Sequence, residues 1–459
     1  MTDGIFARPY RVATVGIVGL ISLIAFEAVA VATALPTAVR ELNGLAYYGW
    51  SFSALLVTSM VAMVISGELS DRFGPRAPVL IGTASFLAGL LVAGFAPDMG
   101  VFLLGRALQG VGVGLLIVVM TVMVGDQYPE QLRPQVFGAI SAAWVLPALI
   151  GPVIAGALAQ GPGWRWVFLG LVPLVVTALA SLTPTLRRSR RPEHPVPPRR
   201  ARRVAAVGAA LGVAAVQWAL QDLSWVRVPV LLAGLVLLVV SLRSLLPRGT
   251  GAVRRGVPAV VAFRGLMAGV FTSIESLVPL TLTLVHGYSP TAAGVPLTVG
   301  ALGWSAASYW QGRHGHVPRH RLIRACFVLI FIAAAGLAVV AQPWSPAWVI
   351  YPVWIAGGAG MGLGMSSVSV LLLSFSPPAE RGVNSSALQL SDGVGSALCI
   401  GLGGALVAAS ARGLLPLNRA AAALDLAMAA VALAGVVLAG RARPAVRAAS
   451  RRPDTEVVR

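Results

Sequence analysis

Long apolar runs recur from one end of this 459-residue chain to the other, each about as long as a helix needs to cross a bilayer. A spanning helix requires roughly 20 such residues, whereas a strand of an outer-membrane barrel needs about 10 with alternating polarity. Mean hydropathy is +0.82 and only 11% of the residues are charged, which excludes an ordinary soluble domain. The sequence therefore predicts an all-α polytopic membrane protein.

We expect 14 spanning helices in groups of six, two and six. The weakest is 204–221, which is rich in Ala and Gly and contains Gln217. The predicted segments are 14–38, 49–69, 78–96, 101–125, 135–159, 165–184, 204–221, 228–246, 258–285, 289–311, 322–341, 346–374, 383–410 and 420–440.

Basic, Pro-rich stretches separate these groups and set the predicted domains. Most Arg residues fall on the side of the helices that also holds both termini, which the positive-inside rule assigns to the cytoplasm of a multi-pass protein in the cell (inner or plasma) membrane. Removing one adjacent helix pair would leave this orientation unchanged. The domains are an N-terminal six-helix bundle at 1–186, a linker at 187–203, two additional helices at 204–247, a linker at 248–257, a C-terminal six-helix bundle at 258–441 and a basic tail at 442–459.

The net charge of +19 does not indicate a nucleic-acid partner, because the Arg residues cluster in loops and the tail. All 35 basic residues are Arg, so a Gly-Lys-Ser/Thr phosphate loop is excluded. Cys326 and Cys399 lie in apolar helices and provide no disulfide framework. His314, His316 and His320 could bind metal, but a solvated His/Arg loop is the simpler interpretation. We expect no metal, no cofactor and a monomer.

A short charged segment, Gly67 to Arg76, separates the second and third apolar runs. It resembles the signature loop between the second and third helices of the major facilitator superfamily, with Pro75 where an Arg is usual. Gly67 would let helices approach and Gly74 would permit a tight turn, while the charges would ion-pair or cap helix ends. An ordinary solvated loop is the alternative. The predicted gating loop comprises Gly67, Asp71, Arg72, Gly74 and Arg76.

Further motifs extend this resemblance over both halves of the chain. Residues 106–110 are similar to the family's Arg-x-x-Gln-Gly element, and 151–156 to its antiporter motif, although Pro147 and Ala157 replace usual glycines. Residues 287–294 resemble a turn in the fourteen-helix drug:proton antiporters. A kink and a small-residue seam for close helix packing would explain the antiporter motif equally well. Its matching positions are Gly151, Pro152 and Gly156.

Acidic residues inside predicted spans are functional candidates, because a charge in the hydrocarbon region is costly. Glu27 matches the acidic position of the Leu-Asp-x-Thr motif in the same antiporters, with Val29 in place of the Thr. The resemblance implies that Arg106, which cannot deprotonate, modulates an acid that takes and releases a proton. A structural hydrogen-bond network is the alternative. The predicted proton-coupling residues are Glu27, Glu275, Asp392 and Arg106.

Helical spacing places Arg264 and Glu275 on one stripe, and Gln389 and Asp392 on another. Asp222 and Asp425 are instead expected near helix ends, as solvated or capping residues. The candidate residues of the substrate cavity are Gln109, Trp144, Gln389 and Trp304. The two Trp residues could instead be membrane anchors.

Taken with the resemblance, these features predict a secondary active transporter that exports small amphiphilic or drug-like molecules in exchange for protons by alternating access. Its partners would be the substrate, protons and the lipid bilayer. One alternative is proton-coupled transport of a specific lipid or metabolite. A more distant alternative is a membrane sensor or enzyme that does not transport, although the sequence has no Ser/His/Asp, metal or nucleotide constellation.

Overall fold

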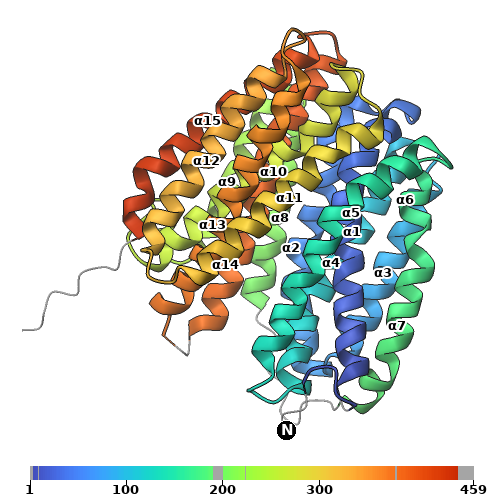
Figure 1. The fold of residues 1–459 in the computed structure, drawn as a ribbon, viewed down its shortest axis with the longest axis vertical. Coiled ribbons are helices and arrows are strands. Elements are labelled where there is room, and N and C mark those ends of the chain that lie inside the picture. The colour runs from blue at the N-terminus through green and yellow to red at the C-terminus, as the bar shows by residue number, and fades with distance from the viewer. Residues whose placement is uncertain (1–3, 9, 190–199, 223, 378–379, 443–459) are drawn as a thin grey trace, which may run out of the picture.

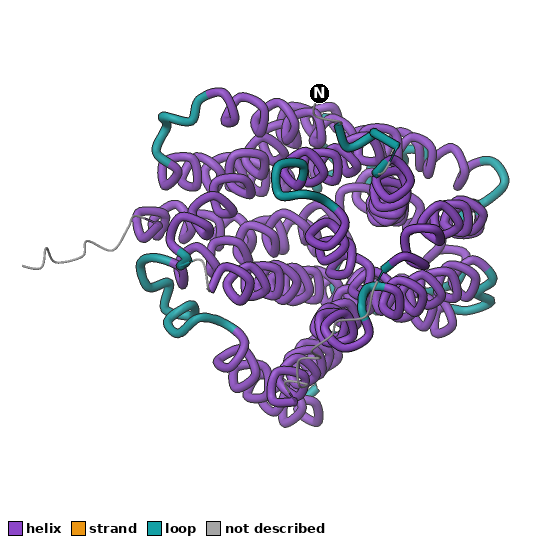
Figure 2. Tube along the Cα trace, turned by 90° about the horizontal axis from the view of Figure 1, so that it is seen from below, coloured by secondary structure: helices purple, strands orange, loops and turns teal. Residues whose placement is uncertain are grey.

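A computed structural model describes residues 4–8, 10–189, 200–222, 224–377 and 380–442. Within these ranges all regular structure is helical, and short loops connect the helices (Figures 1 and 2). Most of the predicted linker 187–203, and the tail 442–459 beyond its first residue, lie outside the described residues.

The first group of helices begins with α1 and ends with α7. Gly170 separates α6 from α7 but keeps helical backbone angles, so the two form one spanning unit from Arg165 to Arg187. The elements are α1 (Arg11–Glu41), η1 (Leu45–Tyr47), α2 (Tyr48–Phe73), α3 (Arg76–Gly94), α4 (Met99–Gln127), α5 (Arg133–Gln160), α6 (Arg165–Leu169) and α7 (Leu171–Arg188).

The remaining helices form the additional pair and the second group. The pair consists of α8 (Arg200–Leu220) and α9 (Val228–Leu245), with η2 (Trp225–Arg227) before α9. The second group consists of α10 (Val257–Leu284), α11 (Pro290–Arg313), α12 (Arg319–Val340), η3 (Ala347–Val349), α13 (Ile350–Phe375), α14 (Arg381–Ala411), α15 (Leu417–Leu438) and η5 (Ala439–Ala442).

Each of the 14 predicted segments coincides with a helical unit, and 13 of these units are long and apolar enough to cross a membrane. The doubtful segment 204–221 is among them, as α8. The unit that falls short is α11, whose sequence is interrupted by Gly, Ser and Thr. Helix α11 is nevertheless held between α5 and α13, so neighbouring protein replaces part of the lipid contact.

The two groups repeat one packing order. In the first, α4 packs on α2 and α3, and α1 packs on α5 and α7; in the second, α13 packs on α11 and α12, and α10 packs on α14 and α15. The groups lie side by side in Figure 1 and meet through α5 with α11 and through α2 with α14. This arrangement is the one expected for parallel repeats.

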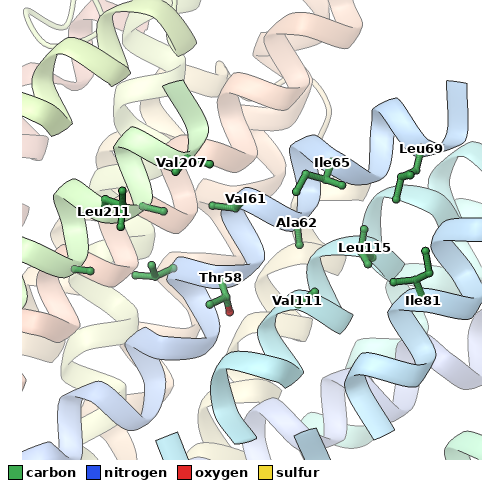
Figure 3. Close-up of a pocket in the computed structure, with 13 residues that line it drawn as sticks. Thr58, Val61, Ala62, Ile65, Leu69, Ile81, Val111, Leu115, Val207 and Leu211 are labelled. Atoms are coloured by element: carbon green, nitrogen blue, oxygen red, sulfur yellow. The ribbon is translucent and has the colours of Figure 1, made fainter. Parts of the chain in front are cut away.

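The additional pair lies against both groups, with α8 in contact with α2 and α14. An apolar groove of about 440 Å³ separates part of α8 from α2, α3 and α4 (Figure 3). Val207 and Leu211 of α8 line one side, and Leu115 and Ile81 line the other. Helix α8 therefore touches the first group without closing against its whole length.

Candidate functional site

A buried ion pair joins α1 to α4. Glu27 and Arg106 are 1% and 3% exposed, and the guanidinium contacts the carboxylate directly. A charge without a partner in this interior would cost several kcal/mol, so each group depends on the other. Two small residues of α4 lie close to Arg106. Gly105 lets α3 approach α4, and Gly110 lets α2 approach it, closely enough to exclude lipid from the ion pair.

Two further groups complete the polar contacts of Arg106. Its Nε donates to the Ser51 carbonyl of α2 at 2.8 Å, and its Nη1 donates to Gln109 Oε1 at 2.7 Å. Gln109 is fully buried, and its Nε2 has no hydrogen-bond partner among the described residues. A free buried amide donor is energetically costly and is suited to a ligand that supplies an acceptor.

Glu275 occupies α10 in the second group without a charged partner. In the described part of the chain, no residue forms a hydrogen bond or ion pair with its side chain. Helix α13, which repeats the packing of α4, contains no charged residue and so supplies no equivalent of Arg106. The next residue, Ser276, accepts a hydrogen bond from Tyr48 of α2 at 2.5 Å, which ties this turn of α10 to the first group.

An ion pair inside the spanning segments also joins α10 to α14. Arg264 Nε donates to Asp392 Oδ2 at 2.6 Å, and its Nη2 reaches Gln389 Oε1 at 3.5 Å. Arg264 and Asp392 are 16% and 25% exposed, so this pair is more accessible than the Glu27 pair. The two polar stripes expected from the sequence thus face each other, although Glu275 does not join them.

The antiporter-type motif forms part of the seam between the groups. A Cβ at Gly156 would overlap the Thr291 backbone of α11, and one at Gly294 would lie 3.0 Å from the Pro152 carbonyl. Gly151 differs, since a Cβ there would make only ordinary contact at 3.7 Å with Phe26. The structure therefore brings residues 151–156 against the predicted turn at 287–294.

The segment from Gly67 to Arg76 corrects two expectations. A Cβ at Gly67 would meet nothing within 4 Å, so this glycine is not needed for close helix approach. Asp71 is exposed and unpaired among the described residues, while the Arg72 guanidinium lies 5.1 Å from the Phe73 ring centroid. Neither charge forms an ion pair with a described residue.

Gly74 does have the predicted role in this loop. Its φ of +75° permits the turn between α2 and α3 at a position where a side chain would be strained. Arg76 begins α3 and is exposed. Within the segment Gly67–Arg76, the residue that forms an ion pair is Glu68, which contacts Arg203 at the start of α8.

The two Trp residues predicted for the substrate cavity lie in different environments. Trp144 on α5 is 41% exposed, as a membrane-facing residue would be. Trp304 on α11 meets Phe271 of α10 edge to face at 5.8 Å between ring centroids, and Phe271 stacks on Trp354 at 5.0 Å. Trp304 thus belongs to an internal aromatic cluster and Trp144 does not.

The family model described as Major Facilitator Superfamily matches residues 15–400. The chain is a member of the major facilitator superfamily. It therefore belongs to a superfamily of transporters, and its candidate spans make it a multi-pass membrane protein.

Several relatives of this transporter carry transport names. It is 26% identical to an MFS-type transporter of Mycobacterium tuberculosis over 82% of this chain and 56% of that protein. It is 25% identical to MFS transporter L2 of a Phoma species, over 84% and 67% of the two chains. The multidrug transporter protein MdtP of Bacillus subtilis is 32% identical over 36% and 31%. The chain spans about half to two thirds of the length of the first two relatives.

Solved structures share the fold of this transporter at low identity. An auto-inhibited POT family peptide transporter superposes with a TM-score of 0.71 at 17% identity, covering 94% of this chain and 98% of that one. The human organic anion transporter MFSD10 superposes with a TM-score of 0.61 at 14% identity, covering 93% and 98%. At these identities the likeness concerns the fold alone.

Sequence reasoning missed one buried acid of this transporter. Asp425 was expected near a helix end in solvent, but it lies inside α15, is 4% exposed and has no partner among the described residues. It faces Ile274 and Thr281 of α10 and Val340 of α12. The predicted start of this helix, at 420, placed Asp425 too close to the terminus; the helix begins at Leu417.

Proposed function

We propose that this transporter exports small amphiphilic or drug-like molecules across the cell membrane in exchange for protons. The observation that carries the proposal is the buried Glu27–Arg106 pair beside Gln109, whose Nε2 has no hydrogen-bond partner among the described residues. Efflux is further supported by the printed names of relatives, which include an efflux pump of Gibberella fujikuroi at 31% identity over 37% of this chain and 31% of that protein.

In the proposed cycle, Glu27 takes up a proton and its ion pair with Arg106 is lost. Protonation removes the carboxylate charge and leaves Arg106 held by the Ser51 carbonyl and Gln109. The contacts between α1 and α4 then become weaker, which changes the relative free energies of the two access states. An organic cation would compete with Arg106 for the deprotonated carboxylate, so proton and substrate would bind alternately.

Glu275 and Asp392 are proposed as further proton or substrate groups of the second group. Glu275 has no charged partner among the described residues, whereas Asp392 is paired with Arg264. The two acids therefore lie in different electrostatic surroundings. We assign the proton first to Glu27, because it alone combines near-complete burial with a cation.

Reconstitution into proteoliposomes tests this proposal. An imposed pH gradient is expected to drive uphill movement of at least one compound from a panel of amphiphiles, and that compound should release protons from the purified protein. The triple variant Glu27→Gln, Glu275→Gln, Asp392→Asn is expected to retain downhill movement and lose the gradient-driven part. Gradient-driven efflux that survives the triple change would show the coupling scheme to be wrong. A response to one compound only would favour the specific-metabolite alternative.

The segment from Gly67 to Arg76, expected as a loop, is helical up to Phe73 and turns at Gly74 and Pro75. It is proposed to control the rate of switching between access states. Asp71 is exposed and lies at the end of α2, remote in sequence from the buried Glu27 pair. We therefore expect Asp71→Asn to slow transport several-fold while the substrate affinity stays nearly constant. Substrate binding to the detergent-purified protein and initial transport rates measure the two quantities separately. A large loss of affinity at normal turnover would contradict this role.

A further inference from the structure

The additional pair is packed into the line along which the two six-helix groups meet. Met60 of α2, Val213 of α8 and Val394 of α14 belong to one buried apolar cluster, to which Leu238 of α9 also contributes. Figure 1 shows α8 between the two sets of helices. A relative movement of the groups must therefore change the contacts of α8 with at least one of them.

The carboxyl end of α8 is fastened to the second group by several polar contacts. Gln217 is 2% exposed, and its Nε2 donates to the Ala397 carbonyl of α14 at 2.5 Å. Arg412, just after α14, donates to the Gln221 carbonyl at 2.5 Å and pairs with Asp222 at 2.9 Å. Together these contacts hold the last turn of α8 and the residues after it on α14.

The amino end of α8 is attached to the first group differently. Arg203 contacts the Glu68 carboxylate near the end of α2, and Oε1 of Glu68 is buried without a hydrogen-bond partner among the described residues. Beyond this pair, the groove lined by Val207 and Leu211 separates α8 from α3 and α4 (Figure 3). The Arg203–Glu68 ion pair thus lies beside unfilled apolar space.

We infer that the additional pair moves with the second group and that the Arg203–Glu68 ion pair is a releasable connection to the first. It holds the end of α2, which leads into the gating loop, in the access state seen here, and it breaks when the two groups rock against each other. The groove beside it provides the room for that displacement. Arg203 and Glu68 are then positioning residues for transport, with no contact to substrate.

The physical reason lies in the difference between the two attachments. The Gln217 contact is buried, so breaking it would leave an unpaired amide and carbonyl in a low-dielectric interior. Arg203 is 43% exposed and can be solvated by water or lipid headgroups once released. The weaker attachment should open first. This inference depends on the proposed alternating access.

Distances between spin labels test this inference on the 459-residue chain, in a background where both cysteines are replaced by Ala. Phe73 with Val204 reports the end of α2 against α8, and both side chains are exposed. Trp225 with Leu414 reports the other end of α8 against α14. Phe73 with Val383 reports movement between the two groups at the same end as Glu68.

The distances are measured at acidic and at alkaline pH, so that proton binding is the only variable. The expected result is that the 73–204 and 73–383 distances change together while the 225–414 distance stays constant. A change at 73–383 with 73–204 fixed would overturn the inference and leave alternating access intact. Movement at 225–414 would also overturn it. A constant 73–383 distance would instead overturn the alternating access on which the inference depends.

Variants show whether the ion pair itself sets the balance. Arg203→Gln is expected to shift the ratio of the two 73–204 populations about five-fold towards the longer distance, the order expected for a partly exposed pair. The charge swap Glu68→Arg with Arg203→Glu should restore the original ratio. Arg200→Gln, one turn away and exposed, is the matched control and should change nothing. Equal shifts in Arg200→Gln and Arg203→Gln, or a swap that fails to restore, would refute the role of the pair.

Discussion

Replacing Glu27 with Gln is expected to abolish proton-driven transport and to destabilise the protein. The change leaves the Arg106 guanidinium, which is 3% exposed, without its counter-charge. Breaking a buried ion pair on one side typically costs about 3–5 kcal/mol, because the remaining charge keeps its desolvation penalty. We therefore expect a clearly lower melting temperature in detergent and no uphill transport in proteoliposomes.

The double variant Glu27→Gln, Arg106→Gln separates structural loss from functional loss. Removing both charges relieves the uncompensated cation, so stability should recover relative to either single variant. Proton-driven transport should not recover, because no titratable group remains at this position. A double variant that regains coupling would show that the pair is structural only.

The same charge change on the surface of α1 provides the control. Glu41 lies in the last turn of α1 and pairs with Arg165, but the two side chains are 50% and 34% exposed. Exposed pairs contribute roughly 0–1 kcal/mol. Glu41→Gln should therefore leave both melting temperature and coupling nearly unchanged.

Adding a methyl group at Gly156 is expected to have the second large effect. The new Cβ would overlap the Thr291 backbone, which cannot rotate away as a flexible side chain could, so α5 and α11 must separate. Overpacking of this kind costs about 1–3 kcal/mol, which corresponds to a shift of roughly 5- to 150-fold in a two-state equilibrium. Gly156→Ala should thus favour a state in which the groups are apart at this end.

Spin labels at Tyr47 and Leu414 can detect this shift, since both are exposed and lie in different groups where η1 meets α14. The longer distance should gain population in Gly156→Ala and the transport rate should fall at least several-fold. Gly151→Ala, in the same motif, has room for its Cβ and is the matched control. Identical distance distributions in the two variants would contradict the proposed seam.

Part of the candidate site could be predicted from local patterns. Glu27 and Arg106 stand out because each is a rare charge within an apolar segment, and Gly74 because a sharp turn between helices needs a positive φ. Glu68 carries the same kind of charge, but its partner is 135 residues away on α8. No local pattern connects Glu68 to Arg203, so this attachment is visible only in three dimensions.

Glycines illustrate the same limit. Gly67, Gly151 and Gly156 are each a motif glycine in the sequence. A Cβ at Gly67 would meet open space, one at Gly151 would make ordinary contact, and one at Gly156 would overlap a backbone. Which glycine is needed depends on where a second helix crosses. That crossing is set by the packing of α5 against α11 and cannot be read from either helix alone.

By itself, the sequence determined the helical membrane fold and the positions of its helices, because the cost of placing polar groups in hydrocarbon acts on each segment separately. The tertiary structure decided which charges meet: Glu27 with Arg106, Asp392 with Arg264, and Glu68 with Arg203, with Glu275 and Asp425 unpaired among the described residues. It also decided that α8 bridges the two groups. Such pairings depend on the relative rotation and height of helices remote in sequence, and hydropathy carries no information about either.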